Sequence, residues 1–126
     1  MADMTKNILV IDDDVLVLRS VRNLLERQGF KVLAASSGDE AKNLILSNDI
    51  NLIISDIRMP GQDGIALIGE IKQLIQQREM MEIPFVFITG YASEDAPIEA
   101  IKLGAKDYLL KPFDLDELLA AVRKNI

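Results

Sequence analysis

The sequence predicts an α/β fold in which helices cover both faces of a parallel β-sheet. Short apolar runs alternate along the chain with stretches whose apolar residues recur at helical spacing. Strands and helices that alternate in this way are joined by right-handed crossovers, so the strands lie parallel. At 126 residues and 49% hydrophobic content, the chain is expected to form one domain with an ample core.

The predicted strands are short runs of mainly apolar side chains. Continuous apolar runs of this kind are typical of strands that are buried on both faces of a sheet. Pro84 stands at the start of the fourth strand, where a missing backbone donor is tolerated. The strands are expected at Asn7 to Ile11, Lys31 to Ala34, Leu52 to Ser55, Phe85 to Ile88 and Asp107 to Leu110.

Capping signals mark several ends of the predicted helices. Ser37 and Glu40 form a capping box before the second helix, and Gly29 ends the first as a C-terminal glycine. Pro97 suits the first turn of the fourth helix, and Asp114 caps the fifth. Five helices are expected: one that ends before Gly29, one from the capping box at Ser37 to about Leu46, one from Ile65 that can extend by a turn beyond its last apolar position at Ile75, one from about Pro97 to near Gly104, and one that follows Asp114.

Four of the predicted strands end in polar side chains that suit a phosphoryl group and a divalent cation. The strand ends in question carry Asp12 and Asp13, Asp56, Thr89, and Lys111. Because ligands sit at the carboxyl ends of the strands in an open parallel sheet, we expect these side chains to meet in one crevice. The convergence predicts a functional site with a sheet behind it.

The aspartates predict a metal site. Asp12, Asp13 and Asp56 would bring three like charges together, which oppose one another unless a cation intervenes. Mg²⁺ is the expected cation, because it prefers oxygen ligands, keeps several waters and is typically held by one or two carboxylates. Zinc is not expected, since the chain has no histidine and no cysteine.

Asp56 is the best candidate for a nucleophile toward phosphorus. It stands alone at its strand end, and a carboxylate beside a cation can form an aspartyl phosphate. The turn-rich stretch Met59 to Gly64 follows it, and backbone amides of such a loop can face an anion. Lys111 and the Thr89 hydroxyl would stabilise the charge on the equatorial oxygens in the transition state.

Charge and composition exclude several other functions. A net charge of −6 argues against direct nucleic-acid binding, which needs a basic surface. No apolar run approaches the roughly 20 residues that a membrane span needs, so a soluble cytoplasmic protein is expected. Because the chain has no histidine, its phosphoryl donor must be another protein or a small molecule such as acetyl phosphate.

Four motifs resemble those of the receiver domain of bacterial two-component response regulators. They are VIDDD at the first strand, SDIRMPGQDG around Asp56, ITG at Thr89 and DYLLKPF around Lys111. The resemblance covers about residues 7–124 of a single receiver domain that spans 1–126. It implies a flavodoxin-like doubly wound (βα)5 sandwich, whose five-stranded parallel sheet has the order 2-1-3-4-5 with helices on both faces.

The resemblance also implies the roles of the site residues. Asp56 would accept a phosphoryl group from a sensor histidine kinase or a phosphotransfer protein, and Lys111 would pair with that group. The cation would be bound by Asp56, by Asp13 directly, by Asp12 through water, and by the backbone carbonyl of Arg58.

A switch is implied as well. Thr89 would swing toward the phosphoryl oxygen and Tyr108 would turn inward, which would remodel the face made by the fourth helix, fifth strand and fifth helix. That face is a candidate surface for a homodimer. The chain is expected to be either a stand-alone receiver or, the interpretation that we favour, a receiver followed by a C-terminal effector domain beyond Ile126. The Lys111–Pro112 peptide is expected to be cis, as it is in relatives.

Simpler interpretations stay open beside these. Asp14 is expected to cap the first helix, and Tyr108 by itself is typical of packing within a strand. One rival function is a receiver-like binding module that is never phosphorylated. Another is a Mg²⁺-dependent phosphatase of similar architecture. A phosphatase of the haloacid dehalogenase type would use Asp12, because Asp12 and Asp14 have its D-x-D spacing.

Overall fold

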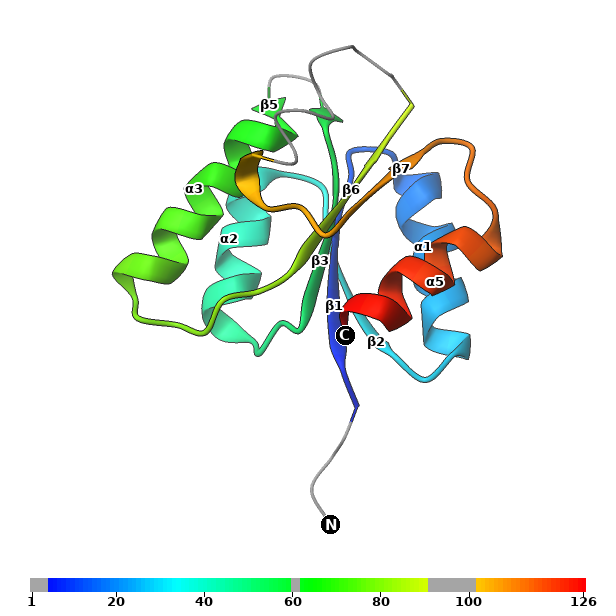
Figure 1. Ribbon diagram of the computed structural model, residues 1–126, viewed down its shortest axis with the longest axis horizontal. Coiled ribbons are helices and arrows are strands. Elements are labelled where there is room, and N and C mark those ends of the chain that lie inside the picture. Colours follow the sequence, from blue (N-terminus) through cyan, green and yellow to red (C-terminus); the bar gives the residue numbers. More distant parts are fainter. Residues whose placement is uncertain (1–4, 60–61, 91–101) are drawn as a thin grey trace.

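A five-stranded parallel sheet forms the centre of the computed structural model, which describes residues 5–59, 62–90 and 102–126 (Figure 1). Its strands lie in the order β2-β1-β3-β6-β7, and each neighbouring pair is parallel. Numbered along the chain, this is the predicted flavodoxin-like order 2-1-3-4-5. The strands are β1 (Asn7–Ile11), β2 (Lys31–Ala35), β3 (Leu52–Asp56), β6 (Phe85–Thr89) and β7 (Asp107–Leu110).

Helices cover both faces of the sheet, as predicted. Figure 1 shows α1 (Val15–Arg27) and α5 (Leu115–Asn125) on one face, with α2 (Gly38–Ser47) and α3 (Gly64–Gln77) on the other. None of the helices in the described part of the chain has the length and apolar character to cross a membrane.

The helix expected at 97–104 falls mainly outside the described residues. Lys102 and Leu103 are helical and lead into Gly104, whose φ is +91°. This left-handed glycine is consistent with the end of a helix near the predicted position.

Successive residues of the central strands enter two separate cores. In β1, Ile8 and Val10 pack in the core beneath α1 and α5, whereas Leu9 and Ile11 pack in the core beneath α2 and α3. Because a strand directs alternate side chains to opposite faces, a strand covered on both faces needs apolar residues throughout. Burial of each such side chain contributes roughly 1.5–3 kcal/mol to the stability of the fold. The sheet therefore holds the groups at the ends of its strands in fixed positions.

Short polar side chains cap the helices. Asp14 and Asp114 were predicted as caps, and Ser37 forms the predicted bond to the backbone N–H of Glu40. Asp63 is a cap that the sequence did not reveal, and its carboxylate accepts a hydrogen bond from Ile65 N. The capping bonds satisfy N–H groups that have no partner within the helix.

Two local features lie beyond what the apolar pattern of the sequence specifies. The turn-rich stretch after Asp56 contains a short antiparallel hairpin of β4 (Arg58–Met59) and β5 (Gln62–Asp63). Helix α3 begins at Gly64, one residue before the predicted Ile65, and runs on to Gln77, after which Glu79 adopts a left-handed conformation with φ +53°. The hairpin has no periodic apolar signal, which is why the sequence pattern did not predict it.

Candidate functional site

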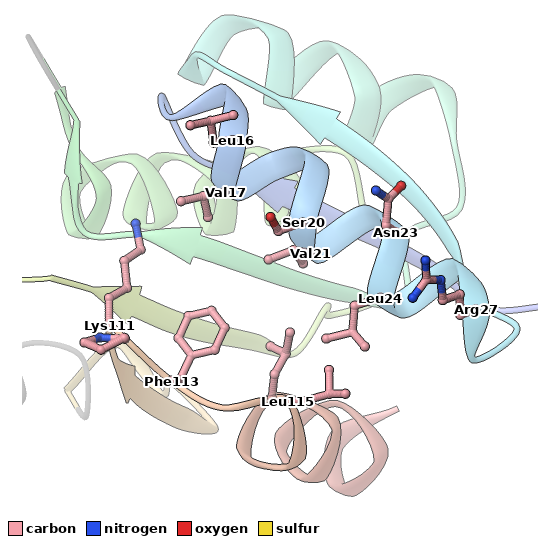
Figure 2. A pocket seen from close by; sticks show the side chains of 12 residues that line it. Leu16, Val17, Ser20, Val21, Asn23, Leu24, Arg27, Lys111, Phe113 and Leu115 are labelled. Carbon is pink, nitrogen blue, oxygen red and sulfur yellow. The ribbon is translucent and has the colours of Figure 1, made fainter.

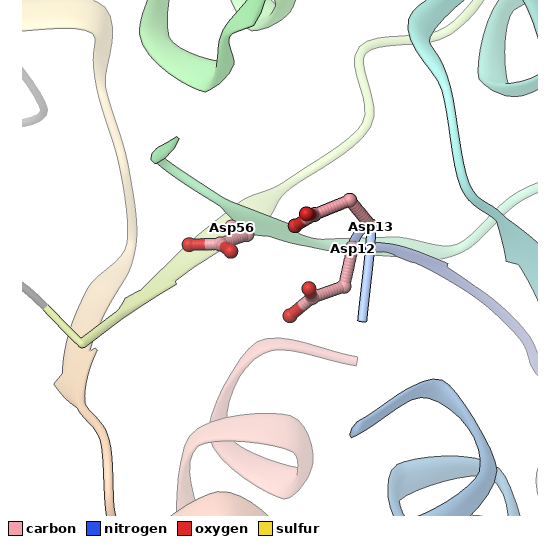
Figure 3. Close-up of side chains that lie close together, drawn as sticks. All are labelled: Asp12, Asp13 and Asp56. Atoms are coloured by element: carbon pink, nitrogen blue, oxygen red, sulfur yellow. The ribbon is translucent and has the colours of Figure 1, made fainter. Parts of the chain in front are cut away.

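Asp12, Asp13 and Asp56 lie together at the carboxyl ends of β1 and β3 (Figure 3). One oxygen from each carboxylate lies within 4.8 Å of the others. Asp12 is fully buried and Asp56 is 6% exposed, whereas Asp13 is exposed. The three predicted aspartates therefore meet, with two of them removed from water and one facing it.

The sheet register explains why aspartates so distant in sequence meet. β1 pairs with β3 as far as Ile11 and Ser55, so each strand leads directly into its aspartate. The backbone N–H of Asp12 donates to the carbonyl oxygen of Ala35 (3.1 Å), which continues the contact with β2. Asp12 Oδ1 in turn accepts a hydrogen bond from Asp14 N (2.9 Å). The buried carboxylate is thus held by the loop that enters α1.

Lys111 joins the fifth strand to two of these carboxylates. Its Nζ lies 2.8 Å from Asp12 Oδ2 and 3.4 Å from Asp56 Oδ2. The backbone N–H of Lys111 donates to the carbonyl oxygen of Thr89 (2.7 Å), so the residue is aligned by β6. The Lys111–Pro112 peptide bond is cis, as the resemblance implies. One ammonium therefore lies between two carboxylates.

The surroundings of Lys111 favour its charged form. Burial alone would lower its pKa, but the hydrogen bond and charge of Asp12, together with Asp56, outweigh burial and raise the pKa of Lys111 above its ordinary value. The lysine is protonated at neutral pH. Since the ammonium contacts only two of the three clustered carboxylates, a hard divalent cation suits the remaining negative charge.

Thr89 and Tyr108 lie on neighbouring strands beside the site. Thr89 ends β6 and is fully buried. Tyr108 pairs in register with Phe87 and packs against the core on the α2 and α3 face. Its hydroxyl oxygen is buried. The predicted switch residues thus belong to adjacent strands, with the tyrosine hydroxyl inside the protein.

Arg58 begins the hairpin that follows Asp56. In β4 it stands opposite Asp63, so its backbone belongs to the loop that leads from the site to α3. The loop closes through a contact that the sequence pattern does not predict: the N–H of Gly64 donates to the carbonyl oxygen of Ile57 (2.6 Å). An Asp-Gly pair just before an apolar helical stretch was the signal that could have indicated a helix start here.

An apolar groove lies between α1 and α5 (Figure 2). Leu16 on α1 is 70% exposed and Leu115 on α5 is 49% exposed. Phe113 also lines the groove, and Figure 2 shows Lys111 at one end of it. The site lysine therefore lies next to exposed apolar surface.

The sheet order and the aspartate–lysine site together define a receiver-type α/β domain. The family of response regulator receiver domains matches residues 8–123 of the chain. This match covers most of the sequence, and the chain belongs to that family.

Curated relatives include transcription regulators. The transcriptional regulatory protein ZraR of Escherichia coli (strain K12) is 39% identical over 120 residues, which are 95% of this chain and 26% of that protein. The aerobic respiration control protein ArcA of the same strain is 33% identical over 119 residues, 94% of this chain and 48% of that protein. The chain thus spans about a quarter to a half of the length of these relatives.

Solved structures show the same fold. A response regulator from Burkholderia pseudomallei, determined with a phosphorylated aspartic acid, a calcium ion and citrate, has a TM-score of 0.83 and 33% sequence identity. The match covers 95% of this chain and 68% of that chain. A CheY-like receiver domain protein from Methanospirillum hungatei JF-1 has a TM-score of 0.85 and 29% identity, over 95% of this chain and 92% of that chain.

Proposed function

We propose that this receiver domain accepts a phosphoryl group on Asp56 and transmits it as a signal. The observation that carries the proposal is the position of Lys111 Nζ, 2.8 Å from Asp12 and 3.4 Å from Asp56. An ammonium beside a nearly buried carboxylate is suited to neutralise an incoming phosphoryl group. Asp12 is held more closely by Lys111 and also by Asp14 N, so we assign the nucleophile to Asp56.

The proposed reaction moves a phosphoryl group from nitrogen to oxygen. A carboxylate oxygen of Asp56 attacks the phosphorus of a phosphohistidine on a sensor histidine kinase or a phosphotransfer protein. The O–P bond forms as the N–P bond breaks, and the bonding electron pair stays with the imidazole nitrogen. Lys111 and the Thr89 hydroxyl stabilise the charge on the equatorial oxygens. The domain is then a signalling module that promotes its own phosphorylation and dephosphorylation.

The donor set fits Mg²⁺. Three carboxylates offer hard oxygen ligands within 4.8 Å of one another, and the exposed Asp13 is accessible to a hydrated ion. We assign Asp13 and Asp56 as direct ligands, Asp12 as a ligand through water, and the backbone carbonyl of Arg58 as a further ligand. When bound, the cation would neutralise charge on the phosphoryl oxygens. The Burkholderia relative, determined with a calcium ion and a phosphorylated aspartic acid, supports this assignment.

We further propose that Thr89 and Tyr108 transmit the structural change that phosphorylation of Asp56 causes. Phosphorylation adds about 1.5 to 2 negative charges, and new hydrogen bonds to Thr89 and Lys111 are strong enough to reverse an equilibrium of a few kcal/mol. The affected face would be that of the fourth helix, β7 and α5. Its partner would be a second copy of the chain or an effector domain that follows the receiver.

The setting of the proposed function is a protein complex in the cytoplasm. The net charge of −6 supports protein partners over direct contact with nucleic acid. DNA binding by a full-length protein would then belong to its effector domain.

Acetyl phosphate with Mg²⁺ tests the proposal. We expect mass spectrometry to find one phosphoryl group on Asp56, and we expect Asp56→Asn to abolish it. The control Asp39→Asn removes an exposed aspartate from the first turn of α2 and is expected to leave labelling unchanged. A phosphoryl group on Asp12 would instead indicate a phosphatase of the haloacid dehalogenase type. No labelling of folded protein would indicate a binding module.

A further inference from the structure

Gly64, the first residue of α3, lies directly against the backbone that carries Asp56. A Cβ atom here would overlap the carbonyl oxygen of Asp56. It would also lie 2.8 Å from Ile57 Cα and 2.9 Å from the Ile57 carbonyl oxygen. All three neighbours are backbone atoms, which cannot rotate aside as a flexible side chain can. Helix α3 therefore begins closer to the end of β3 than a residue with a side chain would allow.

Space, and not backbone conformation, accounts for this glycine. Gly29 and Gly104 have φ values of +94° and +91°, in the region where other residues are strained. Gly64 does not have a positive φ. Alanine could therefore adopt the same backbone angles, and the only unfavourable effect of the substitution would be the steric clash of the added methyl group.

Two hydrogen bonds show that the close approach of α3 to β3 holds the backbone of Ile57 in place. The N–H of Ile57 donates to the carbonyl oxygen of Ile88 on β6 (3.1 Å), and the N–H of Gly64 donates to the carbonyl oxygen of Ile57 (2.6 Å). The residue after Asp56 is thereby clamped between β6 and the start of α3. The β4–β5 hairpin connects Ile57 to Gly64, so the same clamp closes the loop that contains Arg58.

We infer that Gly64 is a positioning residue for the phosphoacceptor site, an inference that rests on the proposed function. Because α3 starts on the Asp56–Ile57 backbone, Gly64 fixes the end of β3 and with it the approach of the Asp56 carboxylate to Lys111. It also fixes the loop that presents the Arg58 carbonyl. A Cβ at this position forces the hairpin and the strand end apart, so the ligands remain present but lose their alignment.

The test compares Gly64→Ala with the matched control Gly69→Ala. The control adds the same methyl group later in the same helix, where nothing lies within 4 Å of the new Cβ. We expect the control to unfold at a slightly higher temperature than the wild-type chain and to keep its site. Thermal unfolding, monitored by circular dichroism, identifies a temperature at which each chain is fully folded. Phosphorylation, Mg²⁺ binding and hydrogen exchange are then measured at that temperature.

Three measurements separate positioning from general stability. Phosphorylation by acetyl phosphate with Mg²⁺ is expected to slow on the order of 10- to 100-fold in Gly64→Ala, as when a reacting group moves by about 1 Å. Mg²⁺ alone, titrated by NMR, is expected to bind roughly tenfold more weakly. Without metal, the Ile57 amide is expected to exchange hydrogen faster than in the wild-type chain, whereas the Ile71 amide in the middle of α3 keeps its wild-type rate.

Several outcomes would overturn the inference. Wild-type Mg²⁺ affinity and phosphorylation rate in folded Gly64→Ala would do so, as would equal acceleration of exchange at Ile57 and Ile71. If Gly64→Ala does not fold, the double variant with Gly69→Ala takes its place, and its failure to fold would show that Gly64 serves folding instead. A wild-type chain that neither binds Mg²⁺ nor accepts a phosphoryl group would contradict the proposed function itself, independently of the glycine comparison.

Discussion

The two ends of the parallel sheet differ in how their polar groups are paired. At the amino ends, the N–H of Asn7 donates to Asn51 Oδ1 (2.8 Å), and Asn7 Nδ2 donates to the carbonyl oxygen of Asp49 (2.6 Å). Lys72 Nζ likewise donates to the carbonyl oxygen of Leu103 (2.6 Å). Each of these donors has a neutral acceptor, which is an arrangement suited to stability.

At the carboxyl ends, like charges are brought together. Three carboxylates lie within 4.8 Å of one another, and the ammonium of Lys111 is the cation that contacts two of them. Buried charge of this kind is unfavourable unless it is paired. The site is thus a locally unfavourable arrangement, and it lies on a scaffold whose opposite end has its polar groups well paired. Measurements of stability at both ends can test this.

The largest effect is expected from Lys111→Met. Asp12 is fully buried, and loss of its ammonium partner leaves an uncompensated charge. We expect the free energy of unfolding to fall by roughly 3 kcal/mol in metal-free buffer at neutral pH, measured by urea unfolding. Lys106→Met, at an exposed lysine, is the control and should change little. An unchanged urea midpoint for Lys111→Met would show that the ion pair does not support the fold.

The same ion pair predicts a pH dependence. The pKa of Lys111 is raised in the folded protein, so the folded state holds this proton more tightly than the unfolded state. The stabilisation is fully present below the ordinary lysine pKa and is lost as pH rises through the raised value. The stability difference between wild type and Lys111→Met should therefore be constant near neutral pH and shrink in strongly alkaline buffer. If this stability difference instead grew as the pH rises, the predicted direction of the pH dependence would be wrong.

Asp56→Asn is expected to act in the opposite direction. It removes one of three opposed carboxylates, so the metal-free protein should gain roughly 1 kcal/mol of stability. Mg²⁺ should then stabilise the variant less than it stabilises the wild-type chain. Thermal unfolding with and without Mg²⁺ measures both effects, with Asp39→Asn as the control. A full Mg²⁺ response in Asp56→Asn would count against a cation bound at this end of the sheet.

Lys72→Met tests the satisfied end. Its loss removes the hydrogen bond to Leu103 and the contact of Nζ with the Phe85 ring, 5.8 Å from the ring centroid. We expect a decrease of about 1 kcal/mol in stability, with a Mg²⁺ response equal to that of the wild-type chain. A changed Mg²⁺ response would mean that the two ends of the sheet are coupled.

The smallest effect is expected from Glu79→Gly. Glu79 has φ +53°, a conformation that glycine adopts without strain. Urea unfolding should show a gain of roughly 0.5 kcal/mol, since the flexibility of glycine in the unfolded chain offsets part of the relief. Glu82→Gly, at a nearby exposed glutamate without a positive φ, is the control and should show no gain.

Strand positions and most helix starts could be predicted from the sequence because their signals are local. Asp14, Ser37 and Asp114 cap helices as predicted, since a cap depends on residues two or three positions away. The hairpin after Asp56 could not be predicted in the same way. Its strand pairing depends on the hydrogen bond by which Gly64 returns to Ile57, and the turn residues between them do not specify that contact.

The side chains that gather at the site could be named from the residue order alone, because a parallel sheet brings its strand ends to one edge whatever the detail of the loops. The three-dimensional packing sets how Asp12 and Asp13, adjacent in the chain, differ, with one buried against Lys111 and the other exposed. It also sets how closely α3 approaches the strand that carries Asp56. Burial and close approach depend on distances between segments remote in sequence, and no local pattern of residues encodes those distances.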